Sequence, residues 1–331
     1  MEWGYGPADI NGLKAKPDMR GMKRFIIETI KSVLKRTDLP VGYGPSPDAL
    51  YKQEASDAIR SELLSEKPSF VARFGWTELD AIIAYTKNIE RNVRFGKLVK
   101  LAMKHLVDNR LLLKESSGFF TNDVESVKRF CQYQIDIMKA IDICATWIKQ
   151  ERFLRKYLSD VVWFSGRSLF DPYVKAPWTA ALEGKRILVV SQFTKSIECQ
   201  YSKREVLFDN RNYLPEFHLE TYKPVQVVDG GRAEYETWWD ALETMKEDIS
   251  QKEFDIAILS CGAFGHPLCA FIKSMGKKAV YMGGELQLMF GVYGDRWSGN
   301  PVINEHWIRP LNVDLPGKGA ANSYKALGNY I

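Results

Sequence analysis

Short apolar runs alternate with longer amphipathic stretches along most of this 331-residue chain. The apolar runs predict buried strands, and apolar residues that recur three or four positions apart predict helices. The expected strands are 69–73, 161–164, 186–190, 225–228, 255–259 and 278–281. The expected helices are 22–36, 48–66 with Asp48 as N-cap, 76–85, 97–107, 122–150, 194–207, 235–250, 263–275 and a short one from Glu285.

Strands that alternate with helices favour a parallel sheet covered on both faces. We therefore expect an α/β fold with a Rossmann-like, mostly parallel sheet for residues 48–331, with a helical insertion at about 91–150. Residues 1–47 form an N-terminal extension in this interpretation, because the Gly- and Pro-rich segment 40–47 is typical of a linker. The helix predicted at 22–36 is amphipathic and basic, so it either docks on its own domain or lies on an anionic membrane surface.

Composition narrows the function classes. Hydrophobic residues make up 45% and charged residues 26%, which argues against a disordered chain. The longest apolar runs are far below the ~20 residues of a membrane span, and residues 1–20 contain no apolar core of a signal peptide. A net charge of +5 without a clustered basic face argues against nucleic-acid binding. The five cysteines include no CxxC pair, which argues against a structural zinc site. We expect a cytoplasmic protein.

Three strand-to-helix junctions in the second half have chemistry that suits a ligand. Ligands of open parallel sheets bind at the carboxyl ends of strands, where loops lead into helix N-termini. Hydroxyl groups at a helix start suit a phosphate, glycines permit close approach of a ligand, and an acid after a Gly-Gly turn suits ribose or sugar hydroxyls. The same residues also serve as ordinary helix caps and tight turns. The candidates are Ser191, Thr194, Ser196, Gly262, Gly265, Gly283, Gly284 and Glu285.

A fourth junction follows the strand at 69–73 and carries Arg73, Gly75, Trp76 and Glu78. Arg73 can neutralise a phosphate, and Glu78 can act as a base or bind a cation, whereas a buried Arg–Glu pair is the structural alternative. Near the C-terminus, Gly-rich loops carry charged and aromatic groups that are typical of the binding site for an acceptor substrate. These residues are Asp295, Arg296, Trp297 and His306.

The segment Arg73-Phe74-Gly75-x-x-Glu78 resembles the R-[FY]-G-D-G-E loop of bacterial glycosyltransferases with the GT-D fold. The second half also resembles relatives of these proteins from capsule and surface-polysaccharide clusters, through 189–197, 254–257, 262–265 and 283–297. The resemblance implies a Rossmann-like enzyme that moves a sugar from a nucleotide-diphosphate donor, with a UDP-sugar favoured. The implied acceptor is a glycan or a lipid-linked glycan, which allows a peripheral contact with the inner face of the membrane.

In that family the D-x-E of the loop is associated with the donor's divalent cation, Mn²⁺ or Mg²⁺. Glu78 matches the glutamate, but Trp76 stands where the aspartate is expected and Thr77 replaces the glycine. A single carboxylate is a poor site for such a cation. Either metal dependence is weak, or Asp80, Glu285 or Asp295 completes the site, or activity is lost. The resemblance assigns Arg73 to the departing diphosphate, Glu78 to the base or metal ligand, and Glu285 to sugar hydroxyls, with Trp76 stacking on a ring.

Two alternatives stay open from the residues alone. The strand, Gly loop, helix, strand and acid between Leu259 and Glu285 also suit an enzyme that uses NAD or S-adenosylmethionine, although the third glycine of that fingerprint is missing. A catalytically degenerate transferase that serves as a binding or scaffold protein is the second alternative, because Trp76 replaces the expected acid.

Overall fold

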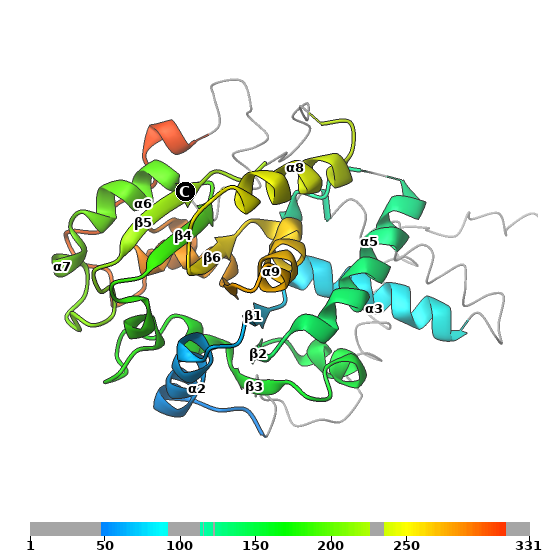
Figure 1. Cartoon of the computed structure of the whole chain (residues 1–331), viewed down its shortest axis with the longest axis horizontal. Helices are drawn as coiled ribbons and strands as arrows, with labels where there is room; N and C mark the ends of the chain where they lie inside the picture. Colours follow the sequence, from blue (N-terminus) through cyan, green and yellow to red (C-terminus); the bar gives the residue numbers. More distant parts are fainter. Residues whose placement is uncertain (1–47, 92–112, 115, 122, 226–234, 316–331) are drawn as a thin grey trace, which may run out of the picture. The chain divides into compact units, whose positions relative to one another are not determined.

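A parallel sheet of seven strands organises the part of the chain that the structure, a computed structural model, describes: residues 48–91, 113–114, 116–121, 123–225 and 235–315 (Figure 1). The strands are β1 Ser69–Arg73, β2 Ile143–Thr146, β3 Val162–Ser165, β4 Arg186–Ser191, β5 His218–Tyr222, β6 Ile256–Ser260 and β7 Lys278–Tyr281. They lie in the order β3-β2-β1-β7-β6-β4-β5, and every neighbouring pair is parallel. The predicted α/β, Rossmann-like fold is confirmed.

Helices cover both faces of the sheet. The α-helices are α2 Lys52–Leu64, α3 Trp76–Arg91, α5 Val124–Ile137, α6 Thr194–Tyr201, α7 Arg204–Leu207, α8 Trp238–Ser250, α9 Gly265–Ser274 and α10 Leu286–Met289. Short 3-10 helices are η1 Met138–Ala140, η2 Lys149–Tyr157, η3 Gly166–Leu169, η4 Trp178–Leu182, η5 Gly262–Phe264, η6 Gly283–Glu285, η7 Asp295–Trp297 and η8 Asn312–Asp314.

The buried strands alternate their side chains between two cores, as the pleat requires. On one face, Phe70 and Ala72 of β1 and Leu259 of β6 pack against α3, α5, α8 and α9. On the other face, Val71 of β1 and Ile258 of β6 pack against α2, α6, α10 and η4. Figure 1 shows α9 beside β6, with α8 next to it. Because both faces are covered, the central positions of the inner strands are apolar, which explains why they form continuous apolar runs in the sequence.

Several predicted elements need correction. Residues 122–150 are not one helix: α5 ends at Ile137, and β2 joins the sheet beside β1. The helix predicted at 194–207 is divided into α6 and α7. Thr237 closes a capping box with Asp240, so α8 begins at Trp238 and not at 235. Asp48 does not cap α2, whose N-cap is Tyr51, and pairs with Arg155 at 3.1 Å.

A strand is also present at His218–Tyr222 that the sequence did not predict, and Val225 lies beyond its end. The rest of the strand predicted at 225–228 lies outside the described residues, as do the extension 1–47 with its helix at 22–36, the helix at 97–107 and part of the predicted insertion.

The loops leave the carboxyl edge of the sheet in different directions. The chain after β1 enters α3 on one face, whereas the chain after its neighbour β7 enters α10 on the opposite face. The neighbours β4 and β6 diverge in the same way, into α6 and α9. Such switch points are where open α/β sheets bind ligands. A ligand-binding site is therefore expected at the β1–β7 switch point.

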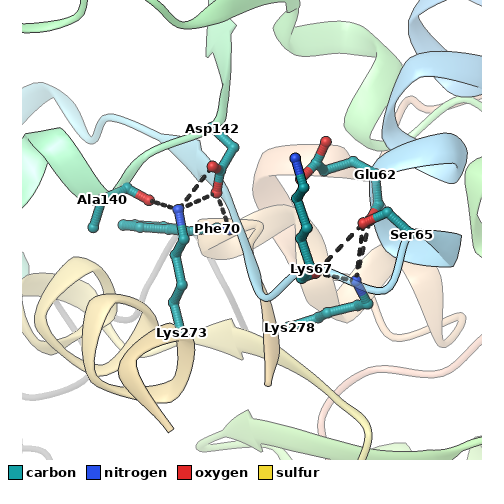
Figure 2. Close-up of polar contacts among 8 residues, drawn as sticks. All are labelled: Glu62, Ser65, Lys67, Phe70, Ala140, Asp142, Lys273 and Lys278. Atoms are coloured by element: carbon teal, nitrogen blue, oxygen red, sulfur yellow. Dashed lines mark hydrogen bonds and ion pairs between the residues drawn. The ribbon is translucent and has the colours of Figure 1, made fainter. Parts of the chain in front are cut away.

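At the opposite, amino edge of the sheet, a half-buried ion pair and lysine hydrogen bonds join neighbouring elements (Figure 2). Lys273 of α9 donates to both carboxylate oxygens of Asp142, at 2.7 and 2.6 Å, and to the carbonyl of Ala140 at 2.8 Å. Asp142 also accepts the backbone N–H of Phe70 at 2.8 Å, so one carboxylate ties α9 to the starts of β1 and β2. Lys278 reaches the carbonyls of Glu62 and Lys67 in the same way.

Replacing Asp142 with Ala should lower the free energy of unfolding by about 2–3 kcal/mol, because it leaves the Lys273 ammonium and the Phe70 N–H without their acceptor. Urea unfolding of the full chain measures this. The exposed pair Glu125–Lys128, also 2.7 Å long, provides the control: Glu125→Ala should cost less than about 0.5 kcal/mol. Equal losses in the two variants would show that the Asp142 contacts contribute no more than a surface pair.

Candidate functional site

Arg73 ends β1 at the β1–β7 switch point, and its side chain is 8% exposed. The guanidinium donates to the carbonyl of Met282 at 2.8 Å and lies 3.3 Å from a carboxylate oxygen of Glu285. Its backbone carbonyl accepts the Nε2–H of His266 at 2.8 Å. Burial lowers the pKa of His266 to about 4, so this imidazole is neutral near pH 7. The loops after β1 and β7 are thus joined through Arg73, and the two predicted residues Arg73 and Glu285 are brought together.

Two tryptophans extend this arrangement. The Arg73 guanidinium lies 4.4 Å from the centre of the Trp147 ring, in cation–π geometry. Trp147 follows β2 and donates its indole N–H to the carbonyl of Phe74 at 2.9 Å, which fixes its ring. Trp76, at the start of α3, meets Trp147 edge to face at 5.8 Å and is 40% exposed. Trp76 therefore offers an exposed aromatic surface beside Arg73.

Glu78 lies in the first turn of α3, where the helix dipole favours a carboxylate. Its side chain is half-buried and folds back against Gly75: a Cβ at position 75 would lie 2.2 Å from Oε2. Burial raises the pKa of Glu78 above its ordinary value, and hydrogen bonds from the backbone and the Ser117 hydroxyl and the charge of Arg73 oppose that shift only in part. The carboxyl is therefore a stronger base than an exposed glutamate.

Glu151, in η2, is a third carboxyl near Arg73, and the sequence analysis missed it. The residue is 2% exposed, and its Oε2 accepts the backbone N–H of Trp147 at 3.1 Å. Burial raises its pKa from the ordinary value of 4.5 to about 7, against the opposing effects of hydrogen bonds from Thr146 and the backbone and of the Arg73 charge. We call Arg73, Glu78, Trp147, Glu151 and Glu285 the Arg73 cluster.

The pKa of Glu151 predicts a pH dependence of stability. A carboxyl whose pKa is raised on folding stabilises the fold below its unfolded pKa, and that stabilisation is lost as the pH rises from about 4.5 to about 7. His266, whose pKa is lowered from 6.5 to about 4, acts with the opposite sign over pH 4 to 6.5. Glu151→Gln should therefore be more stable than the wild type by about 2–3 kcal/mol at pH 8 and equal to it near pH 5.

Urea unfolding of both proteins from pH 5 to 8 checks this, because the difference between the two curves cancels the contribution of His266. A difference that does not change with pH would contradict the pKa shift.

Internal contacts and backbone conformation explain why glycine occupies the positions predicted to admit a ligand. Gly262 has φ +55°, and a Cβ there would lie 2.4 Å from the carbonyl oxygen of Ser117. A Cβ on Gly265 would enter the ring of Tyr281. Gly283 has φ +58° and turns the chain beside Arg73, and Gly284 completes η6 before Glu285. Gly262 and Gly265 are thus explained by internal packing, whereas Gly283 and Gly284 shape the loop that delivers Glu285.

The β4 junction is occupied by the chain itself. The Ser191 hydroxyl accepts the N–H of Phe193 at 3.2 Å, and Thr194 begins α6. At the helix N-terminus, the carboxylate of Asp314 accepts the N–H of Lys195 at 3.1 Å and the N–H and hydroxyl of Ser196 at 2.7 and 2.6 Å. The predicted phosphate position is therefore taken by a carboxylate, which uses the same amides and the same helix dipole.

Asp314→Ala should lower the free energy of unfolding by about 2–3 kcal/mol, because a buried N–H group, a partly buried N–H group and a buried hydroxyl lose their acceptor. Asp314→Asn keeps one oxygen and should lose less. The exposed Asp209→Ala serves as the matched control and should stay within about 0.5 kcal/mol of the wild type. Thermal or urea unfolding measures all three; a neutral Asp314→Ala variant would show that the carboxylate does not hold the helix start.

The four residues predicted for the acceptor side lie on the loops after α10. Asp295 pairs with Arg309 at 2.6 Å, and Arg296 lies 5.4 Å from the centre of the Trp297 ring. His306 is exposed, 3.8 Å from Glu305. None of these contacts involves a member of the Arg73 cluster.

A divalent cation does not fit these residues. The described part of the chain contains no group of three or more His, Cys, Asp or Glu side chains arranged to hold a metal ion. The neighbours of Glu78 are a hydroxyl and a guanidinium, and the latter repels a cation. Trp76, in the position of the expected aspartate, brings no ligand oxygen.

The Arg73 cluster can accept a proton, donate hydrogen bonds to an oxygen and present an aromatic face, all at a switch point of a parallel sheet. Within the described residues, no helix is long and apolar enough to cross a membrane. Comparisons of the chain with protein-family models, with curated proteins and with solved structures find no match.

Proposed function

We propose that this protein is a glycosyltransferase that moves a sugar from a nucleotide-diphosphate donor to a glycan or lipid-linked acceptor in the assembly of surface polysaccharide. The observation that carries the proposal is the meeting of Arg73, Glu78 and Glu285 at the carboxyl edge of β1 and β7. The Arg-Phe-Gly-x-x-Glu loop that resembles the GT-D glycosyltransferases supplies two of these residues. We propose a UDP-sugar as donor and the cytoplasm as location, with a peripheral membrane contact through residues 22–36.

In the proposed reaction the acceptor hydroxyl attacks the anomeric carbon of the donor sugar. The bond from that carbon to the diphosphate oxygen breaks, the nucleoside diphosphate leaves with the electron pair, and Glu78 takes the proton of the attacking hydroxyl. A raised pKa suits Glu78 to this role, because a stronger base accepts the proton more readily.

Thermal unfolding of the full chain against a ligand panel tests the proposal: UDP, GDP, CDP, dTDP and their hexose conjugates, NAD and S-adenosylmethionine, each with and without Mn²⁺. A ligand at 100 times its Kd stabilises the fold by about 2.7 kcal/mol, which raises the Tm by several degrees. Stabilisation by one nucleotide sugar is the expected result. Stabilisation by NAD or S-adenosylmethionine alone would replace the proposal with a different nucleotide enzyme.

A degenerate, non-catalytic GT-D-like binding or scaffold protein is the second candidate. Two observations favour it, namely Trp76 in the place of the expected aspartate and the lack of a three-ligand metal group in the described part of the chain. This candidate predicts donor binding without release of nucleoside diphosphate, or no response to the panel.

A further inference from the structure

The charges of the Arg73 cluster do not favour an anion. The cluster holds one guanidinium and three carboxyl groups. That guanidinium is engaged by the carbonyl of Met282, the carboxylate of Glu285 and the ring of Trp147, and only 8% of Arg73 is exposed. A diphosphate placed here would meet three carboxyl groups before it met an unpaired positive charge.

The pKa shifts of Glu78 and Glu151 point in the same direction. Opposite charge nearby lowers the pKa of a carboxyl, and burial raises it. For both Glu78 and Glu151 burial outweighs the attraction of Arg73, and the pKa of each is raised. For Glu78 and Glu151 the charge of Arg73 is therefore a weaker influence on the pKa than burial.

Polar atoms of the cluster and its surroundings remain without a hydrogen-bond partner in the described part of the chain. They are Oε1 of Glu151 and the hydroxyl of Tyr213, whereas Oε2 of Glu285 lies 3.3 Å from the Arg73 guanidinium. Tyr213 is fully buried, and the charge of Glu285 contributes to a raised pKa of its hydroxyl, which places it near that carboxylate. Buried polar atoms are rarely left unpaired, so an uncharged donor and acceptor such as a sugar hydroxyl suits this place.

An accessible apolar face stands next to these oxygens. Trp76 is 40% exposed and rests edge to face on Trp147. Glu78 lies two residues after Trp76 in the first turn of α3, and Glu285 pairs with the Arg73 guanidinium that lies over the same Trp147 ring; both glutamates are half-buried. Carboxyl oxygens next to an indole face match a pyranose, whose hydroxyls donate hydrogen bonds and whose C–H face packs on an aromatic ring.

We propose that the Arg73 cluster and Trp76 hold the uncharged sugar ring of the donor, and that the diphosphate lies outside the cluster. This inference rests on the proposed transferase function and revises the role that the resemblance implies for Arg73. In this arrangement Arg73 is a positioning residue that aligns Glu285 and Trp147. Trp76 stands where an aspartate is expected, and its ring packs against the sugar.

Calorimetric titration of the full chain distinguishes a donor whose sugar lies at the Arg73 cluster from a donor whose diphosphate lies there. The probes are UDP, GDP, CDP and dTDP and the hexose conjugate of each, with wild type, Trp76→Ala and Glu285→Gln. Tyr173→Ala, a more exposed aromatic residue, and the exposed Glu253→Gln are the matched controls. Trp76 is exposed, so its replacement should leave the fold intact.

We expect one nucleotide hexose to bind at least tenfold more tightly than its nucleoside diphosphate. Both Trp76→Ala and Glu285→Gln should remove that advantage without weakening the diphosphate, and the controls should change neither Kd. If instead Glu285→Gln tightens binding of the nucleoside diphosphate, or if neither variant changes the advantage, the inference is overturned while the transferase function stands. If no nucleotide hexose binds the wild type, the proposed function fails, and this inference fails with it.

Discussion

Glu78→Gln should lower the rate of sugar transfer at least 100-fold, whereas the Kd of the donor should change less than threefold. A general base contributes about 10²–10⁴ in rate, and glutamine keeps the shape and the hydrogen bonds of the side chain but cannot take a proton. The raised pKa of Glu78 adds a second signature: the wild-type rate should rise with pH at a value above the ordinary 4.5 of a glutamate, because only the ionised form accepts a proton.

The measurement is release of nucleoside diphosphate from the nucleotide sugar that stabilises the full chain most, with a panel of p-nitrophenyl glycosides as acceptors. Glu247→Gln, an exposed change on α8, should have wild-type activity. If Glu78→Gln transfers sugar as fast as the wild type, Glu78 is not the base. If wild type releases no diphosphate although it binds the donor, the binding-protein alternative is favoured.

Arg73→Met should lower the free energy of unfolding by about 3–5 kcal/mol at pH 7.5. The substitution leaves the partly buried carboxylate of Glu285 without its counter-ion and the Met282 carbonyl without its donor, and breaking a buried pair from one side typically costs this much. The loss should be smaller at pH 5, where Glu151, whose pKa is raised to about 7, is largely protonated.

Urea unfolding at the two pH values measures the effect. Arg186→Met is the control, because Arg186 is half exposed and pairs with Glu253 at the surface; it should cost less than about 1 kcal/mol. A loss below about 1 kcal/mol for Arg73→Met at pH 7.5 would show that the guanidinium is not the electrostatic centre of the cluster.

The parallel sheet could be predicted because most of its strands are buried on both faces and bounded by helices. β1 and β7 lie at the predicted residues 69–73 and 278–281, and Arg73 and Glu285 follow from their carboxyl ends. β5 was missed because an edge strand with alternating polar residues, His218–Tyr222, does not form an apolar run.

β2 was missed for a different reason, and two members of the site were missed with it. Its four residues Ile143–Thr146 follow α5 and η1 so closely that they continue the helical pattern, and only pairing with β1 and β3 distinguishes them. Trp147 was therefore assigned to the helix predicted at 122–150, and Glu151 follows the end of that predicted helix. In the sequence, the short apolar run that ends at Thr146 and Trp147 was the feature that could have indicated this strand.

Contacts between distant segments could not be predicted at all. Asp314 reaches the start of α6 from 118 residues away, and the hydroxyls of Ser191 and Ser196 alone gave no sign that a carboxylate would occupy that position. The same holds for Ser117 beside Glu78 and Gly262. Spacing along the chain identifies a helix start with free amides, but the partner of those amides is set by tertiary packing.

The central claim is that the carboxyl edge around Arg73 binds a nucleotide sugar. Hydrogen–deuterium exchange of the full chain, with and without the nucleotide sugar that stabilises it most in the panel, tests this directly. The account predicts slower exchange in residues 73–79, 146–151 and 283–287, which carry the Arg73 cluster, with 180–216 unchanged. Protection confined to other segments, or a chain that no nucleotide sugar protects anywhere, would contradict it.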